Sequence, residues 1–113
     1  MSIVVVYAVI DLDPARRSEA LTTAKPHIDA ALAQRGCRSY AWTADPHAPA
    51  RVHVFEEWDD RDALATHLAG PAYRGMLGHM QGFGITNAVS DKYRVDAKQP
   101  VYNAAGRATA DFA

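Results

Sequence analysis

The stretch Cys37–Trp58, CRSYAWTADPHAPARVHVFEEW, decides how this chain of 113 residues folds. Its two ends, 37–43 and 51–58, are rich in aromatic and β-branched residues, which favour strands. Between them lies Asp45–Pro49, DPHAP, whose composition is typical of a turn. The stretch therefore predicts an antiparallel hairpin with a loop of medium length.

The residues before the hairpin predict a strand followed by a helix. Residues 2–12 are apolar at both odd and even positions, so both faces of this strand should be covered. Residues 14–35 place apolar side chains at helical spacing. Pro26 removes one backbone hydrogen bond and predicts a kink near Thr22 and Thr23, and Gly36 suits the end of the helix.

The residues after the hairpin repeat the helix-then-strand order. Asp59 or Asp60 can cap a helix that continues to residue 68, and Gly70-Pro71 separates it from a second helical piece at 72–81. Residues 85–95 predict a fourth strand. The order β-α-β-β-α-β predicts an α+β, ferredoxin-like domain over residues 1–98, with one antiparallel sheet and helices on one of its faces. Residues 99–113 are expected to form a C-terminal tail that lies on a surface or is disordered.

One helical layer leaves the other face of the sheet without cover. The first strand is nevertheless apolar on both parities, and Cys37, Tyr40, Ala41 and Trp42 occupy both parities of the second. The sheet of a second subunit is the simplest cover, so we expect a homodimer.

Composition and charge exclude several classes of function. A formal net charge of -1 and a pI near 6.5 give no electrostatic case for nucleic acid or for a membrane surface. Cys37 is the only cysteine, so no disulfide can form within the chain. The N-terminus lacks the features of a signal peptide, and its apolar run is about half the length of a membrane span. We expect a cytoplasmic protein.

Three short motifs occur in register on this pattern of elements. They are Gly36-Cys37-Arg38-Ser39-Tyr40 at the second strand, Phe55-Glu56-Glu57-Trp58 with the acidic helix start after it, and His67 followed by Pro71, Tyr73 and Arg74. In their order and spacing, residues 1–97 resemble the antibiotic biosynthesis monooxygenase family and its quinol-monooxygenase-like members.

The resemblance implies a dimeric α/β barrel with a pocket between sheet and helices in each subunit. It also implies the oxidation of a small aromatic substrate (a quinol, a phenol or a polyketide-like anthrone) by O₂ without a cofactor. Other members degrade haem, so family alone does not fix the reaction. Two polar positions of the anthrone-oxidising members correspond to Val54 and Leu64 here, and the first strand lacks the Asn of the haem-degrading branch.

His67, Trp58 and Tyr73 are the catalytic candidates. His67 is the natural proton acceptor near neutral pH, and the rings of Trp58 and Tyr73 would hold an aromatic substrate. His67 can equally be a structural histidine bonded to backbone or to a carboxylate such as Glu56. Glu56 lies on the same strand face as Trp58 and needs a partner, either His67 or an arginine of the hairpin (Arg38 or Arg51).

Further residues are candidates for the wall of a pocket. We expect substrate to contact Glu56, Tyr40, Phe55, Met76 and Met80, although an aromatic and methionine set at these spacings is also ordinary core. The five histidines show neither His-x-x-x-His nor His-x-His spacing, so no metal site is expected.

Two other functions fit the same residues. An isomerase or cyclase that works by proton transfer would use His67 and Glu56 equally well. A non-catalytic dimer that binds a small molecule or haem is the other alternative, and the apolar residues at Val54 and Leu64 favour it mildly.

Overall fold

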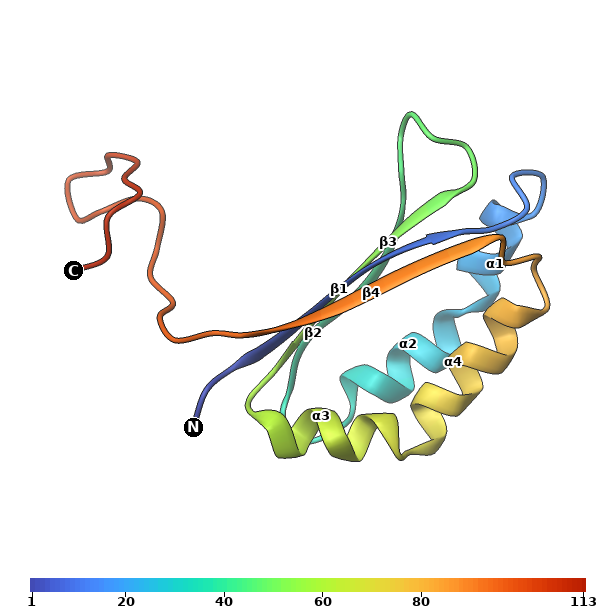
Figure 1. The fold of residues 1–113 in the computed structure, drawn as a ribbon, viewed down its shortest axis with the longest axis horizontal. Helices are drawn as coiled ribbons and strands as arrows, with labels where there is room; N and C mark the ends of the chain where they lie inside the picture. The colour runs from blue at the N-terminus through green and yellow to red at the C-terminus, as the bar shows by residue number, and fades with distance from the viewer.

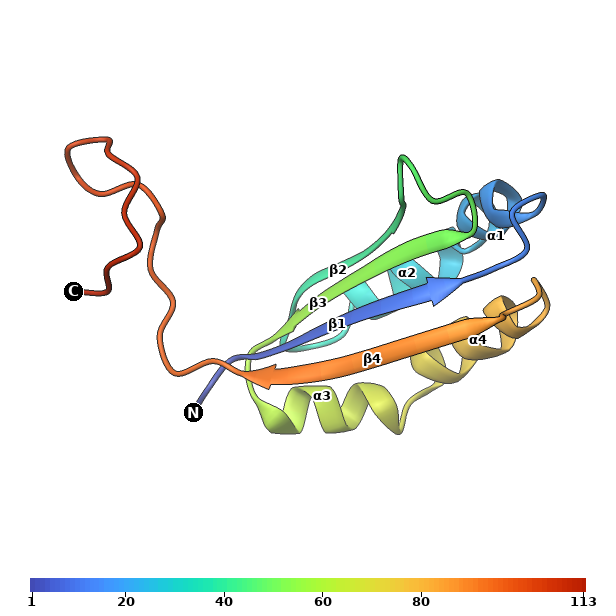
Figure 2. The ribbon, with the colours of Figure 1, turned by 45° about the horizontal axis from the view of Figure 1, so that its top comes forward.

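The structure is a computed structural model that describes residues 1–113. Its four strands form one antiparallel sheet in the order β2-β3-β1-β4, and its four helices all lie on one face of that sheet (Figures 1 and 2). In chain order the elements are β1 (Val4–Asp11), α1 (Arg17–Thr23), α2 (Lys25–Leu32), β2 (Cys37–Ala44), β3 (Arg51–Trp58), α3 (Arg61–Leu68), α4 (Pro71–Gln81) and β4 (Asn87–Arg94). The predicted ferredoxin-like α+β fold is confirmed. None of the helices combines the length and the apolar character that crossing a membrane requires.

The predicted kink in the first helical layer is a complete break. The helices α1 and α2 meet at Ala24, and Pro26 occupies the first turn of α2, where its missing N–H costs nothing. The second helix ends at Leu32, three residues before the predicted end, and a turn follows to Gly36, whose φ is +85°. After β3, Asp60 rather than Asp59 caps α3, because its carboxylate accepts the Ala63 N–H at 2.9 Å.

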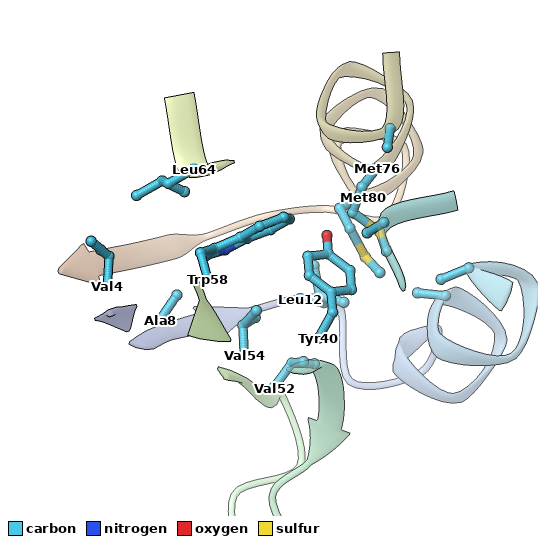
Figure 3. Close-up of a cluster of buried hydrophobic side chains, with 14 residues drawn as sticks. Val4, Ala8, Leu12, Tyr40, Val52, Val54, Trp58, Leu64, Met76 and Met80 are labelled. Carbon is cyan, nitrogen blue, oxygen red and sulfur yellow. The ribbon is translucent and has the colours of Figure 1, made fainter. Parts of the chain in front are cut away.

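The strand register decides which side chains face the helices. Val4 pairs with Trp58 and with Arg94, and Val6 pairs with Glu56 and with Lys92. Directly paired residues point to the same side, so alternate residues of every strand line the space between sheet and helices. This space holds the core, in which Trp58 lies beneath Leu64 and the Tyr40 ring points from the sheet toward the helices (Figure 3).

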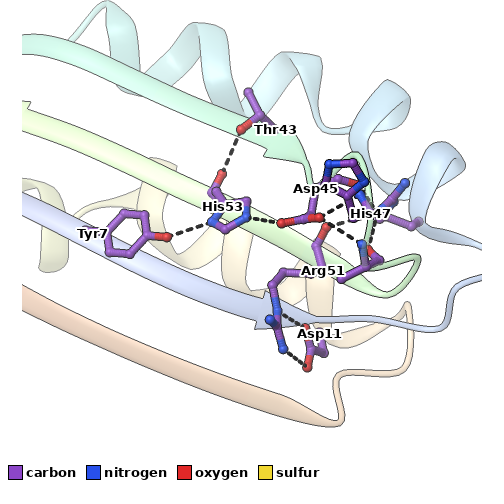
Figure 4. A network of polar contacts seen from close by, with 9 residues as sticks. Tyr7, Asp11, Thr43, Asp45, His47, Arg51 and His53 are labelled. Atoms are coloured by element: carbon purple, nitrogen blue, oxygen red, sulfur yellow. Dashed lines mark hydrogen bonds and ion pairs between the residues drawn. The ribbon is translucent and has the colours of Figure 1, made fainter.

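The hairpin loop between β2 and β3 is fastened by a polar network (Figure 4). Asp45 is hydrogen-bonded to His53 at 2.7 Å and accepts the backbone N–H groups of His47 and Ala48. These bonds, that from His53 foremost, hold the pKa of the Asp45 carboxyl well below its usual range. The Tyr7 hydroxyl is the last member of the network and is hydrogen-bonded to His53 at 2.7 Å, so the network connects the loop to β1.

Residues 99–113 extend away from the body instead of lying along it (Figure 1). The Lys98 ammonium contacts the Glu57 carboxylate at 2.9 Å where the tail leaves the sheet, and Tyr102 and Ala108 form an isolated antiparallel bridge within it. The radius of gyration is 15.8 Å, against about 13 Å for a compact domain of this size. The tail therefore exposes Val101, Tyr102 and Phe112 to solvent.

Candidate functional site

The three predicted catalytic residues come together between β3, α3 and α4. The His67 ring lies 4.5 Å from Trp58, 5.5 Å from Tyr40 and 5.9 Å from Tyr73, measured between ring centroids. The two tyrosines meet the imidazole edge-on. His67 is 1% exposed, so the imidazole is enclosed by aromatic rings.

Hydrogen bonding determines which nitrogen of His67 carries a proton. Nδ1 is bonded to the amide oxygen of Gln34 at 2.5 Å, and since that oxygen can only accept, Nδ1 is the donor. Nε2 is buried without a partner and carries the free lone pair. Burial lowers the pKa of His67, which keeps the ring neutral at neutral pH.

The expected pairing of Glu56 with His67 does not form. The Trp58 indole stands against both groups: its ring packs on His67, and its Nε1–H donates to Glu56 at 3.0 Å. The hairpin arginines are engaged elsewhere, Arg38 with Asp59 at 2.6 Å and Arg51 with Asp11 at 3.1 Å.

Glu56 is therefore a buried carboxyl group with a single donor. It is 9% exposed, and burial raises its pKa, while the hydrogen bond from Trp58 acts in the opposite direction. A carboxylate of raised pKa in an apolar wall is a stronger base than one in water.

A cavity of about 230 Å³ lies between the sheet and α4. Of the predicted site residues, Glu56, Tyr40, Tyr73, Met76 and Met80 line it; most of its other lining side chains are apolar: Ala8, Ile10, Trp42, Val54, Leu77, Ile85 and Ala88. His67 and Trp58 do not line it but stand directly behind Tyr40, Tyr73 and Glu56. Phe55 is on the opposite face of the sheet, opposite Tyr7, and is 41% exposed, so this chain does not bring it to the cavity.

Two residues of the site were not predicted. Gln34 orients His67 across 33 residues of sequence, and no local spacing signals such a pair. Trp42 was placed on the strand but not in the site; its Nε1 is buried without an acceptor, and its ring lines the cavity. Because the Nε1 atom is buried, a ligand oxygen can reach it only after a side chain of the wall moves. No group of three or more His, Cys, Asp or Glu side chains is placed to hold a metal ion.

Gly36 brings Gln34 within reach of His67. Its positive φ turns the chain sharply after α2, and a Cβ on Gly36 would lie 2.6 Å from the Cβ of Ala63 in α3. We expect Gly36→Ala to lower the free energy of unfolding by about 2–4 kcal/mol. The strain of a left-handed backbone conformation at alanine and the overpacking against Ala63 both contribute to this loss. Urea unfolding measures it.

Gly84→Ala is the matched control for this prediction. Gly84 also has a positive φ, but its added Cβ would meet the Asp13 Cβ at 3.3 Å, which a shift of a few tenths of an ångström in the exposed loop relieves. The control should lose only the strain energy of about 1–2 kcal/mol. Equal losses in the two variants would contradict the close approach of the Gly36 turn to α3.

The lowered pKa of His67 predicts a pH-dependent stability. Below the ordinary value of 6.5 the unfolded chain binds a proton that folded His67 resists, so stability present above this pH is lost as the pH falls. The free energy of unfolding of the wild type minus that of His67→Gln should therefore decrease from pH 7.5 to 5, by at most about 1.4 kcal/mol per pH unit. A difference that does not change with pH would show that His67 is protonated as readily when folded as when unfolded.

Comparison with known proteins gives a family and a fold. Residues 3–77 match the model of the family described as antibiotic biosynthesis monooxygenase. Among solved structures, the chain is similar to a Deinococcus radiodurans protein provisionally assigned as an antibiotic biosynthesis monooxygenase, with a TM-score of 0.78 and 18% identity over 88% of this chain and 99% of that one. The Rv0793 protein of Mycobacterium tuberculosis has a TM-score of 0.75 and 22% identity, covering 88% of this chain and 100% of that one.

A conserved protein of Methanosarcina mazei is similar at a TM-score of 0.75 and 21% identity, covering 83% of this chain and 93% of that one. No protein with a curated description matches the sequence. At these identities the structural matches establish the fold, while the family model establishes the family.

Proposed function

This chain belongs to the antibiotic biosynthesis monooxygenase family, and we propose that it oxidises a small phenol or quinol with O₂, using Glu56 as the proton acceptor. The observation that supports this proposal is a buried carboxyl group of raised pKa in the wall of an otherwise apolar, aromatic-lined cavity. Proton abstraction makes a phenol electron-rich enough to react with O₂, and the apolar lining of the cavity reduces the contact of the anion with water.

The size of the cavity favours a small substrate. At about 230 Å³ it is smaller than the roughly 300–1,000 Å³ pockets that hold drug-sized ligands. One or two fused rings are therefore preferred over a polycyclic anthrone. The rings of Tyr40, Tyr73 and Trp42 would contact the ring of the substrate.

The proposed reaction balances without an external reductant. Glu56 accepts the phenol proton, and the phenolate transfers an electron to O₂. Recombination at a ring carbon gives a peroxide anion, which takes the proton back from Glu56 and becomes a hydroperoxide. Loss of water then leaves a quinone, so one oxygen atom enters the ring and the other leaves as water with the phenol and ring hydrogens.

In this proposal His67 is not the first proton acceptor. Its unpartnered Nε2 lies behind Tyr40 and Tyr73, where it can take up a proton only after a side chain of the wall moves. Glu56 is the proton acceptor that faces the cavity directly, which is why we assign the first proton transfer to it.

The test is O₂ uptake by purified, metal-free protein with a panel of one- and two-ring phenols and quinols. The proposal expects quinone that carries one labelled oxygen atom when labelled O₂ is supplied. Absence of uptake across the panel overturns it. A product of unchanged mass instead indicates the isomerase or cyclase alternative, and binding without turnover indicates the non-catalytic one.

We also propose that two copies pack through the uncovered face of the sheet. That face presents one apolar cluster on neighbouring strands: Val5, Tyr7, Val9, Ala41, Phe55, Val89 and Tyr93. Tyr7, Phe55, Val89 and Tyr93 are between 39% and 53% exposed in the single chain. A two-fold dimer would cover this face with its own copy, and the projecting tail leaves the body from an edge of the same sheet.

Light scattering with size-exclusion chromatography tests the dimer. Phe55→Lys places a charge in the centre of the apolar cluster and should shift the mass toward the monomer. Leu32→Lys is the control, since Leu32 is 48% exposed on a helix at the other side of the molecule. A monomeric wild type would overturn the proposal.

A further inference from the structure

The edge strand β4 carries two unpaired, exposed cations on the face of the sheet that bears the helices. Lys92 is paired with Val6 and Arg94 with Val4 in the sheet, so both side chains project on the helix-covered face. Neither forms a salt bridge or a side-chain hydrogen bond in the structure. Figure 2 shows β4 at the edge of the sheet beside α3 and α4.

These cations border a half-open cleft of about 470 Å³, which we call the outer chamber. Its third cation is Arg61 at the start of α3, which contacts only the neighbouring Asp62, at 2.9 Å on the surface. The rest of the wall is apolar, made by Val4, Leu64, Ala65 and Leu68, and it contains no carboxylate. The chamber thus combines positive charge with an apolar lining.

The outer chamber and the candidate site are connected through shared lining residues. A middle chamber of about 240 Å³ shares Leu64, Leu68 and Lys92 with the outer one. It shares Glu56, Tyr73 and Ser90 with the inner cavity. Asp91, on the opposite parity of β4, is the one other carboxylate at its border. A molecule that reaches Glu56 by this route passes the cations of β4.

We propose that Lys92 and Arg94, with Arg61 opposite them, bind a carboxylate of the substrate whose phenolic ring occupies the inner cavity. This assignment rests on the proposed function for the orientation of the ring, and it narrows the substrate class to aromatic hydroxy acids. Arginine offers a carboxylate two parallel N–H donors, a geometry that a neutral ligand cannot use as well. The apolar lining carries the hydrocarbon between the charged end and the ring.

A different reason for charges at these positions is protection of the sheet edge. Inward-pointing lysine and arginine on an edge strand discourage pairing with another chain. That role needs no ligand, and it predicts that replacing the cations changes self-association and not the affinity for small anions. The two readings therefore separate in a binding experiment.

The experiment compares 4-butylphenol with 4-(4-hydroxyphenyl)butanoate, a neutral phenol and its analogue with a carboxylate at the end of the alkyl chain, by titration calorimetry on the full chain. We expect the wild type to bind the acid roughly 10- to 100-fold more tightly, as charge-assisted hydrogen bonds allow. The double variant Lys92→Gln/Arg94→Gln should lose this preference and keep its affinity for 4-butylphenol. The preference should also weaken with added salt.

The control is Lys25→Gln/Arg107→Gln, which removes the same charge from exposed positions remote from the chambers. It should keep the preference for the acid. Equal affinities of the wild type for the two ligands, or a preference that survives in Lys92→Gln/Arg94→Gln, would overturn the carboxylate site. Since the readout is binding, a carboxylate preference without O₂ uptake would refute the monooxygenase proposal alone.

Discussion

Replacing Glu56 by glutamine is expected to reduce the turnover of a phenol or quinol by about 10²- to 10⁴-fold, the usual contribution of a positioned general base. Glutamine keeps the shape of the side chain and an oxygen that accepts the Trp58 N–H, but it cannot take a proton. The loss should therefore appear in kcat, with KM nearly unchanged. Initial rates of O₂ uptake measure both constants.

Glu57→Gln is the matched control, because Glu57 is the next residue of β3 and faces the uncovered side of the sheet, where it contacts Lys98. It should retain full activity. If Glu56→Gln also remains active while His67→Gln loses activity, His67 is the base and a movement of the wall must admit it to substrate.

The pH profile alone does not distinguish the two bases. Burial raises the pKa of Glu56 above its ordinary 4.5 and lowers that of His67 below its ordinary 6.5. A base must be deprotonated to act, so in either case activity rises with pH. Both shifts move the midpoint of this rise into the range between 4.5 and 6.5. For Glu56 the rise lies at higher pH than for an exposed glutamate, and it should vanish in Glu56→Gln and persist in His67→Gln.

The fold was predictable because its signals are local and agree with one another. The limits of β3 follow from its turn and its composition, the break at Ala24 from Pro26, and the start of α3 from Asp60. Strand periodicity also identifies Glu56 as a carboxyl group among inward-facing Val52, Val54 and Trp58. The same periodicity argues against Phe55 as a lining residue, since it has the parity of His53.

The sequence predicted several side chains that line the cavity, but it did not predict Gln34 or Trp42, it misplaced Phe55, and it did not predict which polar groups pair. The contact between Gln34 and His67 depends on a turn at Gly36 whose closeness to Ala63 has no signature in either segment. The pairing of Trp58 with Glu56 joins residues two apart on one strand face, yet a charged partner was the stronger expectation for a buried carboxyl group. Which polar atoms meet is decided by packing between elements, which residue spacing does not encode.

The packing around Trp58 leads to the largest expected change in stability. Trp58 is fully buried between the sheet, Leu64 and the His67 ring (Figure 3). Trp58→Ala should reduce the free energy of unfolding by about 3–5 kcal/mol, since it removes a large side chain, leaves a cavity and deprives Glu56 of its only donor. Urea unfolding followed by far-ultraviolet circular dichroism, at a fixed protein concentration, measures the change independently of tryptophan fluorescence.

The second tryptophan provides the comparison. Trp42 lines the open cavity and is only half-buried, and its Nε1 has no partner to lose. Trp42→Ala should therefore reduce the free energy of unfolding clearly less than Trp58→Ala.

The loss of stability in Trp58→Phe should fall between those of the two alanine variants. The phenylalanine ring still packs on His67, but Glu56 keeps no donor, and the pKa of Glu56 rises further. Its deficit relative to the wild type should therefore shrink as the pH falls toward 4.5, where the unfolded carboxyl is also protonated. Similar losses for Trp42→Ala and Trp58→Ala would show that Trp58 is not the centre of this core. They would also contradict the role of Trp58 in holding the Glu56 carboxyl group in place.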